Sequence, residues 1–457
     1  MQDRTPSLLL TDLYELTMAA AFFENNFNPT ASFELYVRKL PKHRGYLVAA
    51  GLEQALSWLE QTRFSEDDVS FLRQHVSFRH VGDAFFDHLR KLRFTGDVWA
   101  VPEGTVVFGE EPILRVTAPL IQAQLVETYL LAAITFQTMI ATKASRVVAA
   151  AEGRDVIEFG ARRAHGPDAA NLAARAAYIG GCVGTSNVLA GSMFSIPTFG
   201  TMAHSYVMAM REEKQAFEQF TKLFPETSVL LIDTYDTLAA VDKIISSGIK
   251  PAGVRLDSGD LVDLCIEVRR RLDAAGLRAT KILLSGDLDE FKIASMMERD
   301  VPANAFGVGT SLVVSNDAPA LGGIYKLVEI ENGAERTYHA KFSEDKVTYP
   351  GTKQVFRFRG AEGKFSRDLI ACSAERVHGG EALLRPVMRA TKRVIQPAES
   401  LQKIRDRAHG QIELLPAGVR RFTDPAPYEV TFSDELESLL EDVKREHVAL
   451  EGITRQK

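Results

Sequence analysis

The chain has 457 residues, of which 46% are hydrophobic and 25% charged, which is an ordinary globular composition. A chain of this length can bury large hydrophobic cores without disulfide or metal cross-links. Its formal net charge of −6 excludes a generally basic nucleic-acid binder, so an anionic ligand has to be met by a few placed cations. The cysteines, Cys182, Cys265 and Cys372, exclude a disulfide framework and lack metal-ligand spacing, which predicts a reduced, cytoplasmic protein.

The first part of the chain predicts helices and then strands. Asp12 can cap a helix through the run LYELTMAAAFFENN, and residues 31–38 alternate as a half-buried strand does. Residues 52–59 and 69–72 are helical in pattern, whereas residues 96–119 contain turn signals between β-rich runs. These last residues predict a small antiparallel unit.

Neither a signal peptide nor a membrane span is expected. The N-terminus has acidic residues inside its apolar stretch, unlike a signal peptide. The best candidate for a span, residues 125–144, carries Glu127, Gln137 and Lys143, and its clean core is too short to cross about 30 Å. We therefore expect a buried helix there and no membrane partner.

Six short apolar runs follow in the middle of the chain, each ending in a cluster of Gly, Asp, Ser or Thr. They lie at residues 156–163, 196–204, 229–236, 252–260, 281–289 and 305–311. Spacings of roughly 24–40 residues leave room for a strand, a loop and a helix each, which predicts a parallel α/β fold with ligand chemistry at the carboxyl ends of the strands. Six units, not eight, favour an irregular TIM-like barrel, with a doubly wound open sheet as the rival.

From about residue 330 the pattern returns to strands and turns. The segment ERTYHAKFSEDKVTYPGTKQVFRFRG alternates, and residues 434–452 form an amphipathic helical pattern. The chain is thus β-rich at both ends, and these ends can pack together as one domain.

Glycines in the last of the six runs can bring a phosphate close to the backbone. In FGVGTS, Gly307 and Gly309 flank a strand end and Thr310 follows, in a late loop of the kind that often holds phosphate in barrels. Taken alone, the motif favours an ordinary tight turn over a phosphate site. The other glycine-rich stretch, residues 179–187, lacks the Gly-Lys-Ser/Thr ending of a P-loop and is interpreted as a helix-flanking turn.

The run VRLDSGDL places Arg255, Asp257 and Asp260 within six residues. On a strand, Arg255 points opposite to its apolar neighbours, and an arginine in such surroundings costs free energy unless an anion meets it. Its fork of donors suits a carboxylate or a phosphate, while Asp257 and Asp260 can bind sugar hydroxyls or hydrated Mg²⁺. An internal Arg–Asp pair is the alternative.

His204 and a pair of arginines complete the candidate set. His204 follows a Gly-Thr strand end, and imidazole can act as a base, a metal ligand or a phosphoryl acceptor. No second histidine has ligand spacing, which disfavours a histidine metal site, and most histidines are structural or exposed. Arg162 and Arg163 suit a polyanion, although a solvated cluster with Asp168 is as simple. Together these residues predict a small, phosphate-bearing anionic substrate with Mg²⁺.

The motifs, taken in order, resemble those of nicotinate phosphoribosyltransferase over nearly the whole chain. They are TDLYELTMA (11–19), EFGARRAHGPD (158–168), TSNVLAG (185–191), GTMAHS (200–205), LIDTYDT (231–237), GVRLDSGDL (253–261), GVGTS (307–311) and SEDKVTYPGTKQV (343–355). The resemblance implies that nicotinate attacks C1 of 5-phosphoribosyl 1-pyrophosphate, giving nicotinate mononucleotide and pyrophosphate. It also implies ATP hydrolysis coupled through a phosphohistidine, in NAD salvage.

The resemblance also implies an architecture. It predicts an irregular α/β barrel with the active site at residues 119–334, beside an α/β sandwich formed by residues 1–118 and 335–457. It further implies a cytoplasmic homodimer with active sites near the interface, using Mg²⁺ through unidentified ligands and ATP as co-substrate.

Roles at the reacting ring are carried over by motif. The resemblance implies that His204 is the phosphohistidine and that Tyr14 stacks on the nicotinate ring. Thr201 and Arg255 match nicotinate-binding positions, and Arg255 suits the carboxylate. Arg162 matches a substrate-binding arginine at the reacting centre.

Roles at the phosphoribosyl group follow in the same way. Thr310 matches a position that binds this substrate. The inferred geometry of the strand ends, not a motif match, predicts that Gly286 and Gly309 supply backbone donors to the 5-phosphate and that Asp257 holds ribose hydroxyls. His165 stands where relatives often have another residue, and no function is attached to it.

Two other functions stay open. A nicotinamide or quinolinate phosphoribosyltransferase would keep the chemistry and change the base, and Arg255 favours a carboxylate over an amide. A non-enzymatic protein that binds phosphometabolites on the same fold is the other, and the set Arg162, His204 and Arg255 argues against it.

Overall fold

The computed structural model describes residues 6–343, 346–394 and 398–451, and the chain divides into two compact units. The first unit comprises Met1–Thr138, Ala320–Ser400 and Gly410–Lys457, and the second comprises Met139–Pro319 and Leu401–His409. The domain boundaries expected at residues 118 and 334 stay predictions.

A six-stranded parallel sheet forms the centre of the second unit, in the order β7-β6-β11-β10-β9-β8. Its strands are β6 (Asp155–Glu158), β7 (Gly184–Thr185), β8 (Val229–Leu231), β9 (Gly253–Leu256), β10 (Lys281–Leu284) and β11 (Ala305–Val308). Each strand is short and mostly buried, because helices cover a parallel sheet and favour apolar runs. The mixed α/β fold with a parallel sheet is confirmed.

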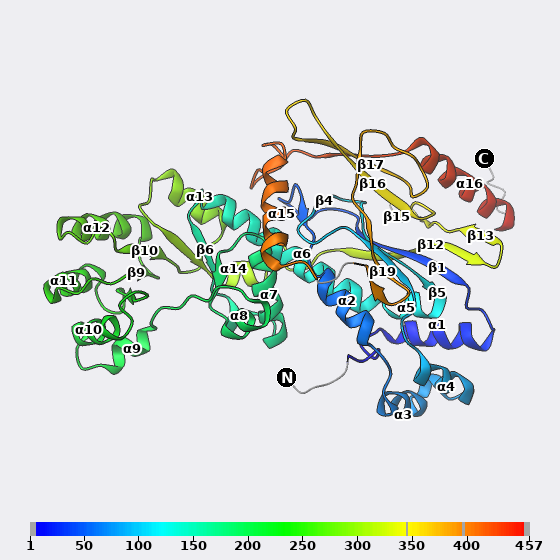
Figure 1. Ribbon diagram of the computed structural model, residues 1–457, viewed down its shortest axis with the longest axis horizontal. Helices are drawn as coiled ribbons and strands as arrows, with labels where there is room; N and C mark the ends of the chain where they lie inside the picture. Colours follow the sequence, from blue (N-terminus) through cyan, green and yellow to red (C-terminus); the bar gives the residue numbers. More distant parts are fainter. Residues whose placement is uncertain (1–5, 344–345, 395–397, 452–457) are drawn as a thin grey trace. The chain divides into compact units, whose positions relative to one another are not determined.

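Helices connect these strands, and neighbours such as α11 and α12 pack side by side (Figure 1). They are η2 (Ala161–Arg163), α7 (Pro167–Ile179), α8 (Val188–Phe194), α9 (His204–Ala209), α10 (Glu213–Leu223), α11 (Thr237–Ser247), α12 (Leu261–Ala274), α13 (Glu290–Glu298) and α14 (Thr310–Val313). Aspartates that follow the strands cap three of them, since their carboxylates accept backbone N–H groups at the starts of α11, α12 and α13.

The second unit differs from the expectation in two respects. Residues 196–204 were expected to form a strand but make only an isolated bridge, Thr185 to Thr198, and the glycine-rich stretch expected to be a turn supplies β7 instead. A strand is disfavoured there because Pro197 has no N–H to donate to a neighbouring strand, although its carbonyl accepts the Thr185 N–H. The sheet is also open, because no pairing joins β7 to β8 in the described residues. A closed barrel is therefore not confirmed.

Both ends of the chain contribute strands to the first unit. Its seven-stranded antiparallel sheet has the order β13-β12-β1-β5-β3-β19-β20, and its four-stranded sheet has the order β18-β16-β17-β21. The N-terminal strands are β1 (Thr30–Val37), β2 (Leu47–Val48), β3 (Asp97–Ala100), β4 (Val106–Val107) and β5 (Pro112–Pro119). The C-terminal strands are β12 (Gly323–Asn332), β13 (Glu335–Tyr338), β14 (Phe342–Ser343), β15 (Lys346–Val347), β16 (Lys353–Arg359), β17 (Phe365–Cys372), β18 (Glu381–Ala382), β19 (Arg385–Arg389), β20 (Lys392–Arg393) and β21 (Glu429–Phe432).

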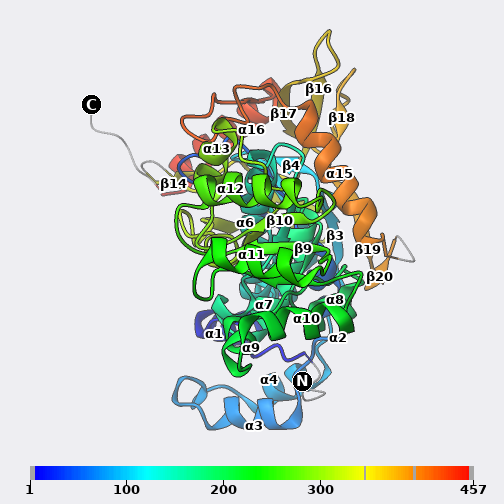
Figure 2. The same ribbon diagram turned by 90° about the vertical axis from the view of Figure 1, so that its left-hand side faces the viewer.

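Both sheets contribute to one hydrophobic core, and the unit also contains helices. They are α1 (Leu13–Glu24), α2 (Leu52–Gln61), α3 (Glu66–Gln74), η1 (Val76–Phe78), α4 (Asp83–Lys91), α5 (Leu120–Leu125) and α16 (Asp434–Glu451) (Figures 1 and 2). Helix α1 follows Asp12 as expected, but the Asp12 carboxylate accepts the Thr128 hydroxyl, 2.9 Å away, and makes no side-chain cap.

The boundary between the units falls within α6 (Glu127–Ala150) and within α15 (Leu401–Leu414). The stretch Leu120–Ala150 is long and apolar enough to cross a membrane by length and composition, yet 56% of its most apolar window is buried inside the protein. Buried Gln137, Lys143 and Arg146 lie on it. A buried core helix, as expected from the sequence, accounts for these features.

Candidate active site

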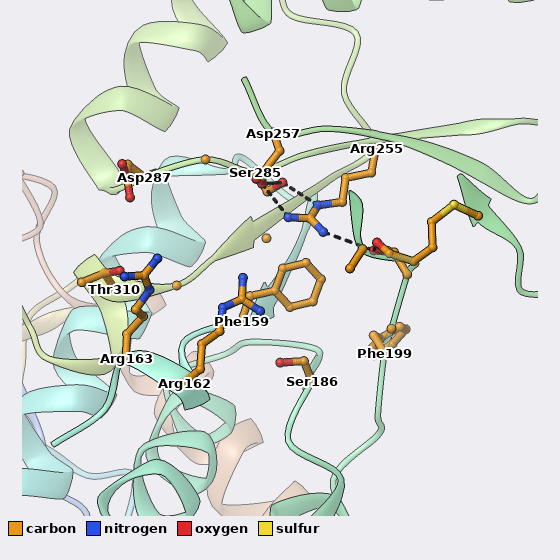
Figure 3. A pocket seen from close by; sticks show the side chains of 17 residues that line it. Phe159, Arg162, Arg163, Ser186, Phe199, Arg255, Asp257, Ser285, Asp287 and Thr310 are labelled. Carbon is orange, nitrogen blue, oxygen red and sulfur yellow. Dashed lines mark hydrogen bonds and ion pairs between the residues drawn. The ribbon is translucent and has the colours of Figure 1, made fainter. Parts of the chain in front are cut away.

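A cavity of about 310 Å³ lies at the carboxyl ends of the parallel strands in the second unit. It is lined by Phe159, Arg162, Arg163, Ser186, Phe199, Gly200, Thr201, Met202, Ala203, Arg255, Asp257, Ser285, Gly286, Asp287, Gly307, Gly309 and Thr310 (Figure 3). Three arginines face two aspartates, so the lining carries a surplus of positive charge although the chain as a whole is negative. Such a site suits a small anion.

The end of β6 presents two arginines and an aromatic ring to the cavity. Beneath them lies Glu158, fully buried, whose carboxylate accepts the N–H of Gly160 and, at 2.6 Å, the hydroxyl of Thr185. Burial raises the pKa of Glu158, against these two hydrogen bonds. The η2 turn then projects Arg162 and Arg163 into the cavity (Figure 3).

Arg255, at the end of β9, is held by three side chains. Its Nε donates to the Ser285 hydroxyl at 2.8 Å, its Nη1 to the Thr201 hydroxyl at 3.2 Å, and its Nη2 to the Asp257 carboxylate at 2.5 Å (Figure 3). The guanidinium carbon also lies 5.6 Å from the centre of the Phe159 ring, within cation–π distance. The guanidinium and the ring thus form one polar and one flat apolar wall.

The Asp257 residue is fixed from two sides. Burial alone would raise its pKa, but the Ser285 hydrogen bond and the Arg255 charge outweigh burial, so its pKa lies below its usual value. Its backbone N–H donates to the Asp233 carboxylate at 2.9 Å, and Ser258 donates to the same oxygen at 2.6 Å. The other carboxylate oxygen of Asp233 is buried and accepts no hydrogen bond within the part of the chain described.

The loops after β10 and β11 bring backbone close to the cavity. Gly286 has a φ of +103°, and a Cβ there would collide with the carbonyl oxygen of Asp257, so only glycine fits. Asp287, the next residue, also has a left-handed backbone, with a φ of 46°. Gly309 and Thr310 line the cavity where β11 gives way to α14.

His204 lies beside this cavity. It is the first residue of α9, directly after Ala203 of the lining, and its Nδ1 lies 3.1 Å from the hydroxyl of Thr234, which follows β8. This contact fixes one ring nitrogen and leaves Nε2 for other chemistry.

Most of the residues predicted from the sequence are brought together. The cavity lining includes Arg162, Thr201, Arg255, Asp257, Gly286, Gly309 and Thr310, with His204 adjacent. Tyr14 lies on α1 of the first unit, where its side chain is half-exposed. Their roles stay predictions.

Several lining residues were not predicted, among them Phe159, Ser285 and Asp287. Phe159 lies three residues before Arg162, and Ser285 and Asp287 flank Gly286 in the run KILLSGDLD. A rule that every polar or aromatic residue beside a strand-end glycine faces the site would have found them.

No group of three His, Cys, Asp or Glu side chains in the described residues could hold a metal ion. Mg²⁺ usually keeps several waters and binds through one or two carboxylates and substrate phosphates. The orphan oxygen of Asp233 and the neighbouring Asp257 fit that mode of binding.

Family models match three segments of the chain. The nicotinate phosphoribosyltransferase N-terminal domain matches residues 9–135, the nicotinate phosphoribosyltransferase family matches residues 155–339, and the C-terminal domain of the same enzyme matches residues 374–440.

Individual relatives agree with these models. The chain is 48% identical over 435 residues to a nicotinate phosphoribosyltransferase from Mycobacterium tuberculosis, covering 94% of this chain and 92% of the relative. It is 42% identical to that of Bacillus subtilis, covering 82% and 78%. Among solved structures, human nicotinic acid phosphoribosyltransferase superposes with a TM-score of 0.83 at 29% identity, covering 95% of this chain and 99% of the other. A nicotinate-nucleotide pyrophosphorylase from Pyrococcus furiosus gives 0.72 at 26% identity, covering 89% and 95%.

Proposed function

The chain belongs to the nicotinate phosphoribosyltransferase family, and on that premise we propose that it transfers the phosphoribosyl group of 5-phosphoribosyl 1-pyrophosphate to nicotinate, releasing pyrophosphate. The observation that carries the proposal is the Arg255 guanidinium beside the Phe159 ring. A planar pyridine carboxylate needs a flat apolar wall and a pair of donors for its carboxylate, and these two side chains supply both.

The rest of the lining suits the phosphoribosyl donor. Arg162 faces the reacting centre and meets the negative charge of the pyrophosphate. Gly286 and Gly309 offer backbone donors to the 5-phosphate and Thr310 adds a hydroxyl, since glycine lets a phosphate approach the backbone. The carboxylate of Asp257 accepts hydrogen bonds from ribose hydroxyls.

The reaction requires no protein nucleophile. The pyridine nitrogen of nicotinate attacks C1 of the ribose, the bond from C1 to the pyrophosphate oxygen breaks, and the transition state has oxocarbenium character. Arg255 and Thr201 orient the ring so that attack becomes effectively unimolecular. Arg162 stabilises the charge that develops on the leaving group.

We propose Mg²⁺ as the metal, held by Asp233 and Asp257 together with substrate phosphates. When bound, it neutralises charge on the pyrophosphate. EDTA in excess over the metal is expected to abolish turnover, and MgCl₂ to restore it.

We also propose that ATP is a co-substrate whose hydrolysis is coupled through a phosphate carried on His204. The support is the position of His204 beside the lining and its ring nitrogen Nε2, which the Thr234 contact does not use. As an ATP-coupled nicotinate phosphoribosyltransferase, the protein would work in NAD salvage in the cytoplasm.

The proposed assembly is a homodimer. Exposed apolar side chains gather on α1 and just before it, where Leu10, Leu13 and Met18 accompany Tyr14. In the second unit, α8 exposes Val188 and its neighbours. Large apolar patches usually mark interfaces. Light scattering is expected to give twice the mass of one chain, and a single-chain mass at assay concentration would reject the dimer.

Tyr14 keeps its proposed role as the ring that stacks on nicotinate.

Three functions have to be distinguished. The purified protein, given nicotinate, 5-phosphoribosyl 1-pyrophosphate, ATP and Mg²⁺, is expected to form nicotinate mononucleotide and pyrophosphate in equal amounts. Turnover of nicotinamide or quinolinate in place of nicotinate would support a phosphoribosyltransferase for another base. Binding without product would support a non-enzymatic protein.

A further inference from the structure

Ser285 joins the two charged side chains that face the cavity from β9. Its hydroxyl accepts the Nε–H of Arg255 at 2.8 Å and lies 2.5 Å from the Asp257 carboxylate (Figure 3). We propose that Ser285 is a positioning residue that sets the rotation of the Arg255 guanidinium and thereby the preference of the site for a carboxylate over an amide. This inference rests on the proposed function, because it concerns how that function's base is recognised.

Backbone contacts fix the position of Ser285. Strands β9 and β10 run parallel, with Leu284 opposite Leu256, and the Ser285 N–H donates to the Leu256 carbonyl at 2.9 Å. The following glycine, Gly286, packs directly against the Asp257 backbone. Ser285 is therefore only 2% exposed, and its hydroxyl is held between Arg255 and Asp257 by the sheet itself.

The remaining donors of Arg255 explain why its rotation matters. A guanidinium has five N–H groups, of which Nε uses its one for Ser285 and each terminal nitrogen uses one, for Thr201 and Asp257. Within the described chain, one N–H on Nη1 and one on Nη2 stay available to a ligand. Two donors on adjacent nitrogens match the two oxygens of a carboxylate.

An amide cannot match the same pair. It offers one carbonyl oxygen and one NH₂ group, so one Arg255 donor would face another donor. This unfavourable contact between two donors weakens the binding of an amide only while the guanidinium is held in one orientation. Without the Ser285 contact the Nε–H loses its partner and the guanidinium can turn, so that a single N–H meets the amide oxygen.

The test compares the affinities of nicotinate and nicotinamide, measured by titration calorimetry on the full chain without turnover. We expect Ser285→Ala to lower the ratio of the two affinities about tenfold or more, as loss of a charged hydrogen bond implies. Ser285→Thr, which keeps the hydroxyl, is expected to restore most of the ratio. Ser247→Ala on α11 is the matched control, since that hydroxyl donates to the Ile244 carbonyl and accepts the Ile249 N–H outside the cavity lining, and its ratio is expected to stay at the wild-type value.

An unchanged ratio in Ser285→Ala would overturn the inference, even if both affinities or the activity fell, because a merely structural role weakens both ligands alike. Where the alanine variant does not fold, Ser285→Cys, of nearly the same size and with a weak acceptor, gives the same comparison. Wild-type turnover of nicotinate is measured in parallel. Its absence would reject the proposed function, while the affinity ratio would still decide the role of Ser285.

Discussion

The Nδ1 atom of His204 lies 3.1 Å from the Oγ1 atom of Thr234. The two residues come from different loops, since His204 begins α9 and Thr234 follows β8. A hydrogen bond to one ring nitrogen sets the tautomer and the orientation of the other. The contact therefore holds the ring and leaves Nε2 for the phosphoryl-acceptor role that we propose for His204.

Labelling with γ-labelled ATP tests this assignment. We expect His204→Ala to lose acid-labile label and stimulation by ATP while keeping some ATP-independent transfer. Thr234→Val is expected to reduce the label severalfold, because the ring is no longer oriented, and Thr234→Ser to recover it. His165→Ala serves as control, because His165 is an exposed histidine of the same unit, and this variant is expected to label normally. Undiminished label in His204→Ala would remove His204 from this role.

Replacement of Arg255 by lysine keeps the charge and removes the fork. Arg255→Lys loses the separate contacts to Ser285, Thr201 and Asp257, and it cannot hold a carboxylate bidentately. We expect kcat/KM for nicotinate to fall roughly 30- to 1,000-fold, which corresponds to a loss of about 2–4 kcal/mol of transition-state stabilisation. The exposed Arg270→Lys is the matched control, because its pair with Glu267 lies at the surface. A kcat/KM within threefold of the wild type would exclude Arg255 from the nicotinate site.

Lys143 stabilises the second unit through a buried ionic cluster. Its Nζ lies 2.5 Å from the Glu290 carboxylate and 2.7 Å from that of Asp317, and both Lys143 and Glu290 are buried. Lys143→Met is expected to cost about 3 kcal/mol in the free energy of unfolding, because buried Glu290 loses one cationic partner and keeps Arg146, whose Nε lies 3.0 Å away. Denaturation in urea measures this change.

The matched control for that variant is Lys214→Met. Lys214 lies 3.9 Å from Glu218, and both side chains are more than two-fifths exposed. Its loss is expected to cost under about 1 kcal/mol, as exposed pairs do. Equal destabilisation by the two substitutions would mean that the buried cluster contributes no more than a surface pair.

Glu15 makes the stability of the protein depend on pH. Burial raises its pKa from 4.5 to about 7, against the hydrogen bonds from Thr11 and Thr128. Between these two pH values the folded chain holds a proton that the unfolded chain releases, so stability is full below pH 4.5 and falls as the pH rises through 7. The loss is at most about 3 kcal/mol, at 1.36 kcal/mol per pH unit.

Glu15→Gln keeps the shape of the side chain and removes its titration. We expect urea midpoints measured from pH 4.5 to 8 to fall less steeply in this variant than in the wild type. Glu24→Gln, on the same helix but with its carboxylate on the exposed N–H of Gly82, is expected to keep the wild-type slope. An identical slope in all three proteins would contradict the role of Glu15.

Much of the site was predictable because it follows strand ends. Arg255 lies within a short apolar run, Asp257, Gly286 and Thr310 follow soon after such runs, and a parallel sheet brings their carboxyl ends to one edge. Ser285 escaped prediction because nothing in a Leu-Leu-Ser-Gly sequence tells which strand its hydroxyl will meet. Its role depends on the register of β10 against β9, which is a tertiary fact.

The fold was predicted less completely. Helix α1, strand β1 and most of the central strands follow local patterns, but β7 is only two residues long and sits where glycines predicted a turn. It forms because Thr185 pairs with both β6 and the segment at Thr198, which local propensity does not encode. The openness of the sheet likewise depends on which edges pair, and periodicity cannot decide that.

The most direct measurement of the central claim is a competition among three bases in one reaction. Equal concentrations of nicotinate, nicotinamide and quinolinate are incubated with the protein, 5-phosphoribosyl 1-pyrophosphate and Mg²⁺, with and without ATP, and the mononucleotides are separated and counted. We expect nicotinate mononucleotide to dominate the products and ATP to increase its yield. Predominant formation of nicotinamide mononucleotide, with nicotinate left unconsumed, would contradict this expectation.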